Sequence, residues 1–225
     1  MGERAMKVRD RMSENVRTVG MDTNINEAFS LMKENNIRRL PVVEKGTVVG
    51  IITLSDLNQV APSSATTLSI HELNYLLAKT KIKDIVSKKQ KLVTIEPNKY
   101  IETAAKLMRR NRISGLPVVE NNRLVGILTE TDIFDAFIDI LGVKKTHSRI
   151  DFYTDDRPGT IAAITGIVAA KGKNILNTVV YFDEKKGKYK MILRVEELDC
   201  EDVIMELKKR GYEVESVIVS PEDNL

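Results

Sequence analysis

The eight residues VGIITLSD at positions 49–56 return as VGILTETD at positions 125–132. Outward from this block, a shift of 76 positions aligns residues 18–56 with residues 94–132, and 17 of the 39 aligned residues are identical. Such repetition is typical of a supersecondary unit that buries its apolar face only against a second copy. The sequence therefore predicts two stacked units whose polar residues form a pair of equivalent sites.

The composition is typical of a globular protein and argues against several other classes. Of 225 residues, 42% are hydrophobic and 30% charged, which is typical of a globular chain. The balance of 35 basic and 32 acidic residues argues against nucleic-acid binding, which usually requires a concentrated basic face. One cysteine, Cys200, and two histidines leave no disulfide framework and no Cys/His metal site. Without a signal peptide or an apolar span, we expect a cytoplasmic protein with no membrane segment, metal or cofactor.

Each copy follows one order of elements: strand, helix, strand, strand, helix. A helical pattern leads into the apolar strand LPVVE, then a short turn, and then a second strand that ends at a Thr. A short leading helix precedes each copy, at 7–13 and at 81–87. We therefore expect an α/β (α+β) chain with one unit at 7–62, a linker helix at 63–80 and a second unit at 81–141.

A different domain is expected at 147–220, where the repeat does not return. Apolar runs and glycine stops predict the order βαββαβ, which is the split ferredoxin-like arrangement. Pro158 is expected at the first position of the first helix, with Asp156 upstream as its N-cap candidate.

The repeated Thr-x-x-Asp carries the chemistry. A strand that ends at Thr53 or Thr129 and turns at once into a helix presents a hydroxyl and free backbone N–H groups, which suit a phosphate. Three residues on, Asp56 or Asp132 can accept both hydroxyls of a ribose. Ser55 and Thr131 add a hydroxyl beside each Asp. The alternative is a capping box that only stabilises the helix.

One basic residue distinguishes the copies. Arg39 lies where the second copy has Gly115. We therefore expect unequal sites, with the first copy's site preferring the more phosphorylated ligand.

These motifs resemble a pair of CBS (cystathionine beta-synthase-type) domains: GIITLSD and GILTETD each follow an LPVVE strand and a helix of the AFSLMKENNI type. The resemblance implies a pseudo-two-fold pair with two clefts for adenosine compounds such as AMP, ADP, ATP or S-adenosylmethionine. It implies that Thr53 and Thr129 contact phosphate and that Asp56 and Asp132 contact ribose. The segments at Thr18 and Thr94 would contact the base.

The segment DRPGTIAAITGIVAAKGKNI at 156–175 is similar to the ACT family of regulatory domains. That resemblance implies a site for an amino acid or another small metabolite at Asp156, Gly159 and Asn174. Two CBS units followed by one ACT unit resemble the bacterial acetoin-utilisation B proteins. The implied protein is a regulator of carbon metabolism.

No nucleophile elbow, zinc-protease motif, Walker A loop or dinucleotide fingerprint is present in the sequence. We therefore expect a non-catalytic regulator that binds an adenine nucleotide, forms a homodimer and acts on an unidentified protein partner. The competing expectation is a module without ligands that assembles with a partner enzyme, in which Thr53 and Thr129 serve as helix caps.

Overall fold

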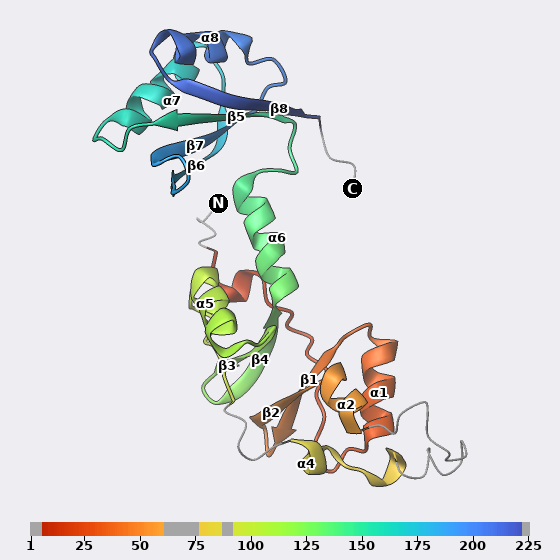
Figure 1. The fold of residues 1–225 in the computed structure, drawn as a ribbon. Coiled ribbons are helices and arrows are strands. Elements are labelled where there is room, and N and C mark those ends of the chain that lie inside the picture. Colours follow the sequence, from red (N-terminus) through yellow and green to blue (C-terminus); the bar gives the residue numbers. More distant parts are fainter. Residues whose placement is uncertain (1–5, 61–76, 87–91, 222–225) are drawn as a thin grey trace. The chain divides into compact units, whose positions relative to one another are not determined.

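The fold is described from a computed structural model, which describes residues 6–60, 77–86 and 92–221 (Figure 1). The chain divides into two compact units, Met1–Phe134 and Asp135–Leu225, and each is treated by itself. The expected linker helix at 63–80 lies largely outside the described residues. Among the described helices, none is both long and apolar enough to cross a membrane.

Both copies of the repeat begin in the first unit, and each copy is a β-hairpin between two helices; the last helix, α6, continues past Phe134. The first copy consists of α1 (Ile25–Glu34), β1 (Arg39–Glu44), β2 (Thr47–Thr53) and α2 (Leu54–Val60). The second consists of α5 (Ile101–Asn111), β3 (Gly115–Glu120), β4 (Arg123–Thr129) and α6 (Glu130–Leu141). The element order expected from the repeat is confirmed, except that the leading strand is reduced to single parallel bridges, Val19 to Val42 and Ile95 to Val118.

The two hairpins are alike in register. Both are antiparallel, and both carry a bulge in the first strand, after Val42 and after Val118. Both turn residues of each hairpin have positive φ: Lys45 and Gly46 in the first, Asn121 and Asn122 in the second. Such pairs match the right-handed twist of the strands that they connect.

The leading segments cross between the copies. The first, which contains η1 (Val8–Asp10), bonds to the second copy: the Ser13 and Ile127 backbones exchange two hydrogen bonds, of 2.9 and 3.0 Å. The second, which contains α4 (Ile82–Ile85), bonds to the first copy, where the Ile82 N–H donates to the Thr23 carbonyl at 2.9 Å. Each copy is therefore completed by the segment that precedes the other copy in the chain.

This crossing explains the glycine of the repeated motif. A Cβ placed on Gly126 would lie 2.5 Å from Met12 Sδ and 3.1 Å from the Ser13 carbonyl oxygen. A Cβ on Gly50 would lie 2.9 Å from a Val86 methyl carbon. Because real Cβ atoms are essentially never closer than 3.0 Å to such neighbours, a side chain at either position would force the Met12 or the Val86 side chain of the crossing segment to move.

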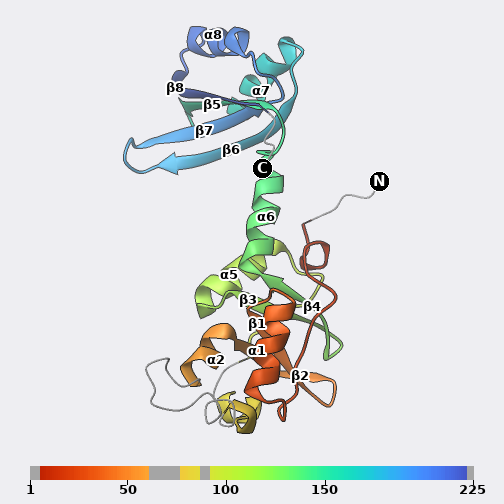
Figure 2. The same cartoon turned by 90° about the vertical axis from the view of Figure 1, so that its right-hand side faces the viewer.

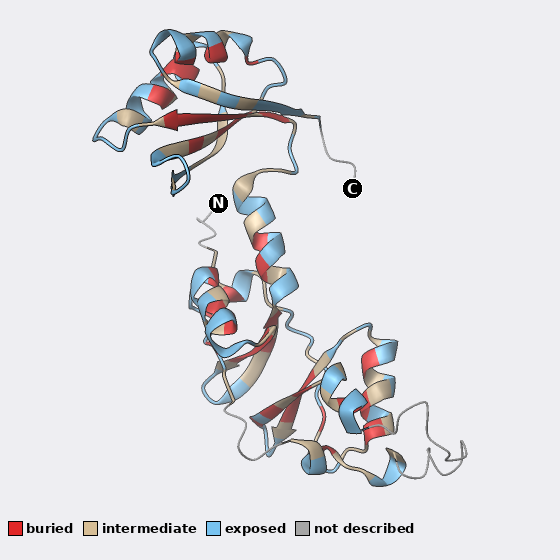
Figure 3. Ribbon diagram, in the orientation of Figure 1, coloured by how far each residue is buried: buried red, intermediate tan, exposed pale blue. Residues whose placement is uncertain are grey.

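Both copies have buried residues on their helices and hairpins (Figure 3), and most of these residues are apolar. In the first copy the α1, β1 and β2 side chains pack with Leu57 of α2 and with Ile82 of the crossing segment; the buried set is Val19, Ile25, Ala28, Met32, Leu40, Val42, Ile52, Leu57 and Ile82. Because Ile82 is fully buried there, the crossing segment is part of the core rather than an addition to it.

The second unit has the βαββαβ order expected from its sequence. Its elements are β5 (His147–Thr154), α7 (Thr160–Ala170), β6 (Ile175–Asp183), β7 (Lys188–Val195), α8 (Glu201–Lys209) and β8 (Glu213–Ser220). The strands form one antiparallel sheet in the order β6-β7-β5-β8, and both helices lie on the same face of it (Figures 1 and 2). Ile150, Phe152, Met191 and Leu193 of the central strands pack against these helices.

The expected start of the first helix in this unit is wrong. Residues 157–160 form a turn in which the Thr160 N–H donates to the Arg157 carbonyl at 3.1 Å, and the helix begins only at Thr160. Pro158 and Gly159 occupy the two central positions, and Gly159 has a φ of 90°. Proline followed by a glycine of positive φ is the signature of a type II turn. Asp156 is therefore not an N-cap.

Candidate functional site

The two Thr-x-x-Asp pairs have one geometry. In the first copy, Asp56 Oδ2 accepts hydrogen bonds from the Thr53 backbone N–H at 2.7 Å and from its hydroxyl at 2.6 Å. In the second copy, Asp132 Oδ2 accepts the same two bonds from Thr129, at 2.6 and 2.7 Å. All four side chains are partly exposed; each Thr ends its strand, and each Asp lies in the first turn of α2 or α6.

These bonds show that the capping contact is made in both copies. Every one of them uses Oδ2, and among the described residues no hydrogen bond reaches Oδ1 of Asp56 or of Asp132. Because an ionised carboxylate has two acceptor oxygens, each Asp retains an acceptor for a ligand. Capping and ligand binding are therefore compatible at these positions.

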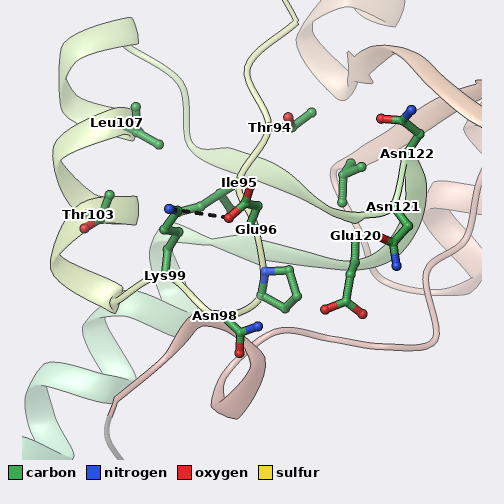
Figure 4. A pocket seen from close by; sticks show the side chains of 12 residues that line it. Thr94, Ile95, Glu96, Asn98, Lys99, Thr103, Leu107, Glu120, Asn121 and Asn122 are labelled. Carbon is green, nitrogen blue, oxygen red and sulfur yellow. Dashed lines mark ion pairs between the residues drawn. The ribbon is translucent and has the colours of Figure 1, made fainter.

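The other predicted residues of the pair lie in different places. Ser55 and Thr131 are exposed to solvent beside their respective Asp residues. Thr94 lines a cavity of about 580 Å³, which also contains the ion pair between Lys99 and Glu96 at 3.4 Å (Figure 4). Thr18 lines another cavity, of about 610 Å³, with the turn of the second hairpin. Neither of these cavities is lined by a Thr-x-x-Asp pair.

The Arg39 side chain makes a contact with the second copy. Its Nη2 donates a hydrogen bond of 2.5 Å to the Ser114 hydroxyl, in the second copy. Burial holds the pKa of Arg39 below its ordinary value, although the nearby charges of Glu130 and Asp132 act to raise it. Because an arginine in a protein stays protonated, this guanidinium is a fixed positive charge whose field is shared with Glu130 and Asp132 of the second copy, while its backbone pairs with Thr53 of the first.

In the second unit, the residues implied by the ACT resemblance bond to separate partners. The Asp156 carboxylate accepts a hydrogen bond that raises the pKa of Tyr189 above its usual value. The Asn174 amide donates to Glu196 Oε2 at 2.6 Å. Gly159 lies in the type II turn. No described contact joins these three residues into one site.

A charged cluster in the same unit was not predicted from the sequence. On the sheet face opposite the helices, Arg149 contacts Asp151 through two hydrogen bonds, of 2.6 and 2.8 Å. Lys190 lies 3.4 Å from Asp151 and also pairs with Glu215. Burial acts to raise the pKa of Asp151, but the bonds from Arg149 and Lys190 outweigh it, so its pKa lies below the ordinary value. The alternation of Arg149 and Asp151 along β5 was the available signal.

Across the described residues, no group of His, Cys, Asp and Glu side chains is arranged to hold a metal ion. Cys200 is buried, and burial raises the pKa of its thiol.

Comparison with known proteins identifies the same two repeated segments. The model of the CBS domain family matches residues 8–62 and 82–139. A CBS domain-containing protein of Dictyostelium discoideum is 36% identical over 136 residues, covering 60% of this chain and 92% of the relative. The CBS domain-containing protein YhcV of Bacillus subtilis is 35% identical over 126 residues, covering 56% and 81%.

Among solved structures, protein MJ1225 of Methanocaldococcus jannaschii superposes with a TM-score of 0.51 at 26% identity, over 60% of this chain and 49% of the other. The family match covers both copies of the repeat, including both Thr-x-x-Asp pairs. This chain therefore belongs to the CBS-domain family.

Proposed function

We propose that the CBS pair binds an adenine nucleotide or S-adenosylmethionine, and that the protein is a non-catalytic, cytoplasmic regulator. The observation that carries the proposal is the duplicated Thr-x-x-Asp at the start of α2 and of α6, in which each Asp keeps one carboxylate oxygen available. Backbone N–H groups at the start of a helix suit a phosphate, and the available oxygen suits a ribose hydroxyl.

The test is isothermal titration of the ligand-free protein with AMP, ADP, ATP and S-adenosylmethionine, repeated on Asp56→Ala and Asp132→Ala. Saturable binding to the wild type that is lost in one variant would support the proposal and assign the site. Asp10→Ala is a matched control, because Asp10 also accepts a bond from a backbone N–H three residues earlier, that of Lys7 at 3.0 Å, but lies outside both motifs. No binding of any of the four compounds to the folded wild type would contradict the proposal.

The complete capping contacts favour a second candidate, a module without ligands that assembles with a partner enzyme. In that case Asp56→Ala and Asp132→Ala would lower the stability of the protein, and no metabolite would change its melting temperature. A bound ligand at a hundred times its Kd would add about 2.7 kcal/mol to the free energy of unfolding. Thermal unfolding with and without each compound therefore separates the two candidates.

For the second unit, we propose the role of an ACT domain, either as a site for an amino acid or another metabolite or as a homodimer interface. Its edge strands favour the interface: Ile218 and Val219 of β8 and Phe182 of β6 are about half exposed, at 49%, 51% and 50%. Unpaired edges with apolar side chains tend to associate. Sedimentation of the wild type and of Ile218→Lys would test this, and two monomeric proteins would contradict it.

The pathway is also a proposal. Because two CBS units before a βαββαβ unit resemble the acetoin-utilisation B proteins, we propose that the protein regulates acetoin-type carbon metabolism. The supporting result would be that the tagged protein copurifies with an enzyme of that metabolism, and that adding the nucleotide changes the amount of enzyme recovered.

A further inference from the structure

Arg39 and Gly115 occupy equivalent positions in the two copies, and the structure shows why they differ. A Cβ placed on Gly115 would lie 2.6 Å from Arg39 Cδ and 3.0 Å from its Nε. The stem of Arg39 therefore fills the space that a side chain at position 115 would need. Because residue 115 is also buried, only one of the two copies can supply a guanidinium here.

The guanidinium is held on the second copy by its surroundings. Its Nη2 donates to the Ser114 hydroxyl at 2.5 Å, and the Ser114 carbonyl in turn accepts the Glu130 backbone N–H at 3.2 Å. Glu130 is the first residue of α6, whose first turn carries Asp132. Arg39 is thus connected to the helix start of the second site through one side-chain bond and one backbone bond.

We propose that Arg39 makes the Asp132 site the phosphate-selective site of the pair. The residue equivalent to Arg39 in the second copy is Gly115, which has no side chain to offer the Asp56 site. That site therefore favours adenosine compounds without a phosphate chain. This inference rests on the proposed function. The sequence predicted that the first copy's site prefers the more phosphorylated ligand. We infer the opposite preference, because Arg39 of the first copy bonds to the second copy. Charge-assisted hydrogen bonds to a phosphate are the stronger class of such bonds, and a guanidinium can form two in parallel.

The experiment is calorimetric titration of the full chain with adenosine, AMP and ATP, with one site observed at a time. Asp56→Ala leaves the Asp132 site, and Asp132→Ala leaves the Asp56 site. Arg39→Gln is then added to each, because glutamine is neutral and keeps part of the stem over Gly115. A double variant, Arg39→Gly with Gly115→Arg, moves the guanidinium to the other copy. A single cooperative thermal transition of each variant shows that it is folded.

We expect Arg39→Gln to lower the ratio of ATP to adenosine affinity at the Asp132 site by about tenfold to a hundredfold. The same change should leave that ratio unaltered at the Asp56 site. In the double variant, the preference for ATP should move to the Asp56 site. The inference would be overturned if Arg39→Gln left the ratio of ATP to adenosine affinity unchanged at the Asp132 site, or lowered that ratio at the Asp56 site. Either result would leave the proposed nucleotide binding intact. If the wild type binds none of the compounds, the proposed function fails as well.

Discussion

The crossing of the leading segments yields a specific prediction for Gly126→Ala. The added methyl group would lie 2.5 Å from Met12 Sδ and 2.9 Å from Met12 Cγ. It would also lie 3.1 Å from the Ser13 carbonyl oxygen, which accepts the Ile127 N–H. The flexible methionine can move aside, but the Ser13 backbone can move only if its two hydrogen bonds with Ile127 lengthen.

Overpacking of this kind costs about 1–3 kcal/mol, and each of the two hydrogen bonds contributes about 0.5–1.5 kcal/mol. We therefore expect Gly126→Ala to lower the free energy of unfolding by about 2 kcal/mol. Urea unfolding followed by circular dichroism measures the loss. Amide hydrogen exchange at Ser13 and Ile127 locates it, because both N–H groups are donors in the crossing pair.

Two further variants serve as controls. Gly166→Ala in α7 places a methyl where no heavy atom lies within 4 Å, and should stabilise the helix by about 1 kcal/mol. Gly126→Ala combined with Met12→Ala removes the methionine contact but keeps the Ser13 contact, so it should restore only part of the loss. The reasoning is refuted if Gly126→Ala unfolds at the urea concentration of the wild type with unchanged exchange at Ser13.

The remaining predictions concern single side chains. Asp132→Ala should lower the free energy of unfolding by about 1 kcal/mol even without ligand, measured by urea unfolding, because it removes the capping bonds to Thr129. Asp151 has a lowered pKa, so its stabilising effect is complete above the ordinary value of 3.8 and is lost as pH falls below it. Unfolding curves measured at falling pH should show a smaller loss in Asp151→Asn than in the wild type. Cys200, which is 3% exposed, should react with a thiol reagent only after unfolding; rapid labelling of the folded protein would contradict its burial.

The repeat was sufficient to predict both hairpins. LPVVE and the strand after it are apolar runs separated by two turn residues, and local preference and burial agree there. The same reasoning failed at Pro158. Proline is equally suited to the first position of a helix and to the second position of a type II turn, and only Gly159 with its positive φ distinguishes them. A proline followed by glycine is therefore better interpreted as a turn.

The contacts around the candidate site were less predictable, because they join the two copies. A sequence motif shows which residues are neighbours along the chain, such as Thr129 and Asp132, whose capping bonds were one of the two alternatives considered. It does not show that Arg39 reaches Ser114, which is 75 positions away. The available clue was the mismatch of the repeat itself: where two copies are stacked, a large residue opposite a glycine indicates that one side chain fills the space of both.

The crossing and the arginine together indicate that neither copy is a self-sufficient unit. Ile82, from the segment before the second copy, is fully buried in the core of the first, and Arg39 of the first copy contacts the second. A ligand that moves α6 would therefore act on Ser114 and Arg39, and through the β1 to β2 pairing of Arg39 with Thr53 on the start of α2. Such shared contacts are the physical requirement for one site to sense the occupancy of the other, provided that the ligand binds the two arrangements with different affinity.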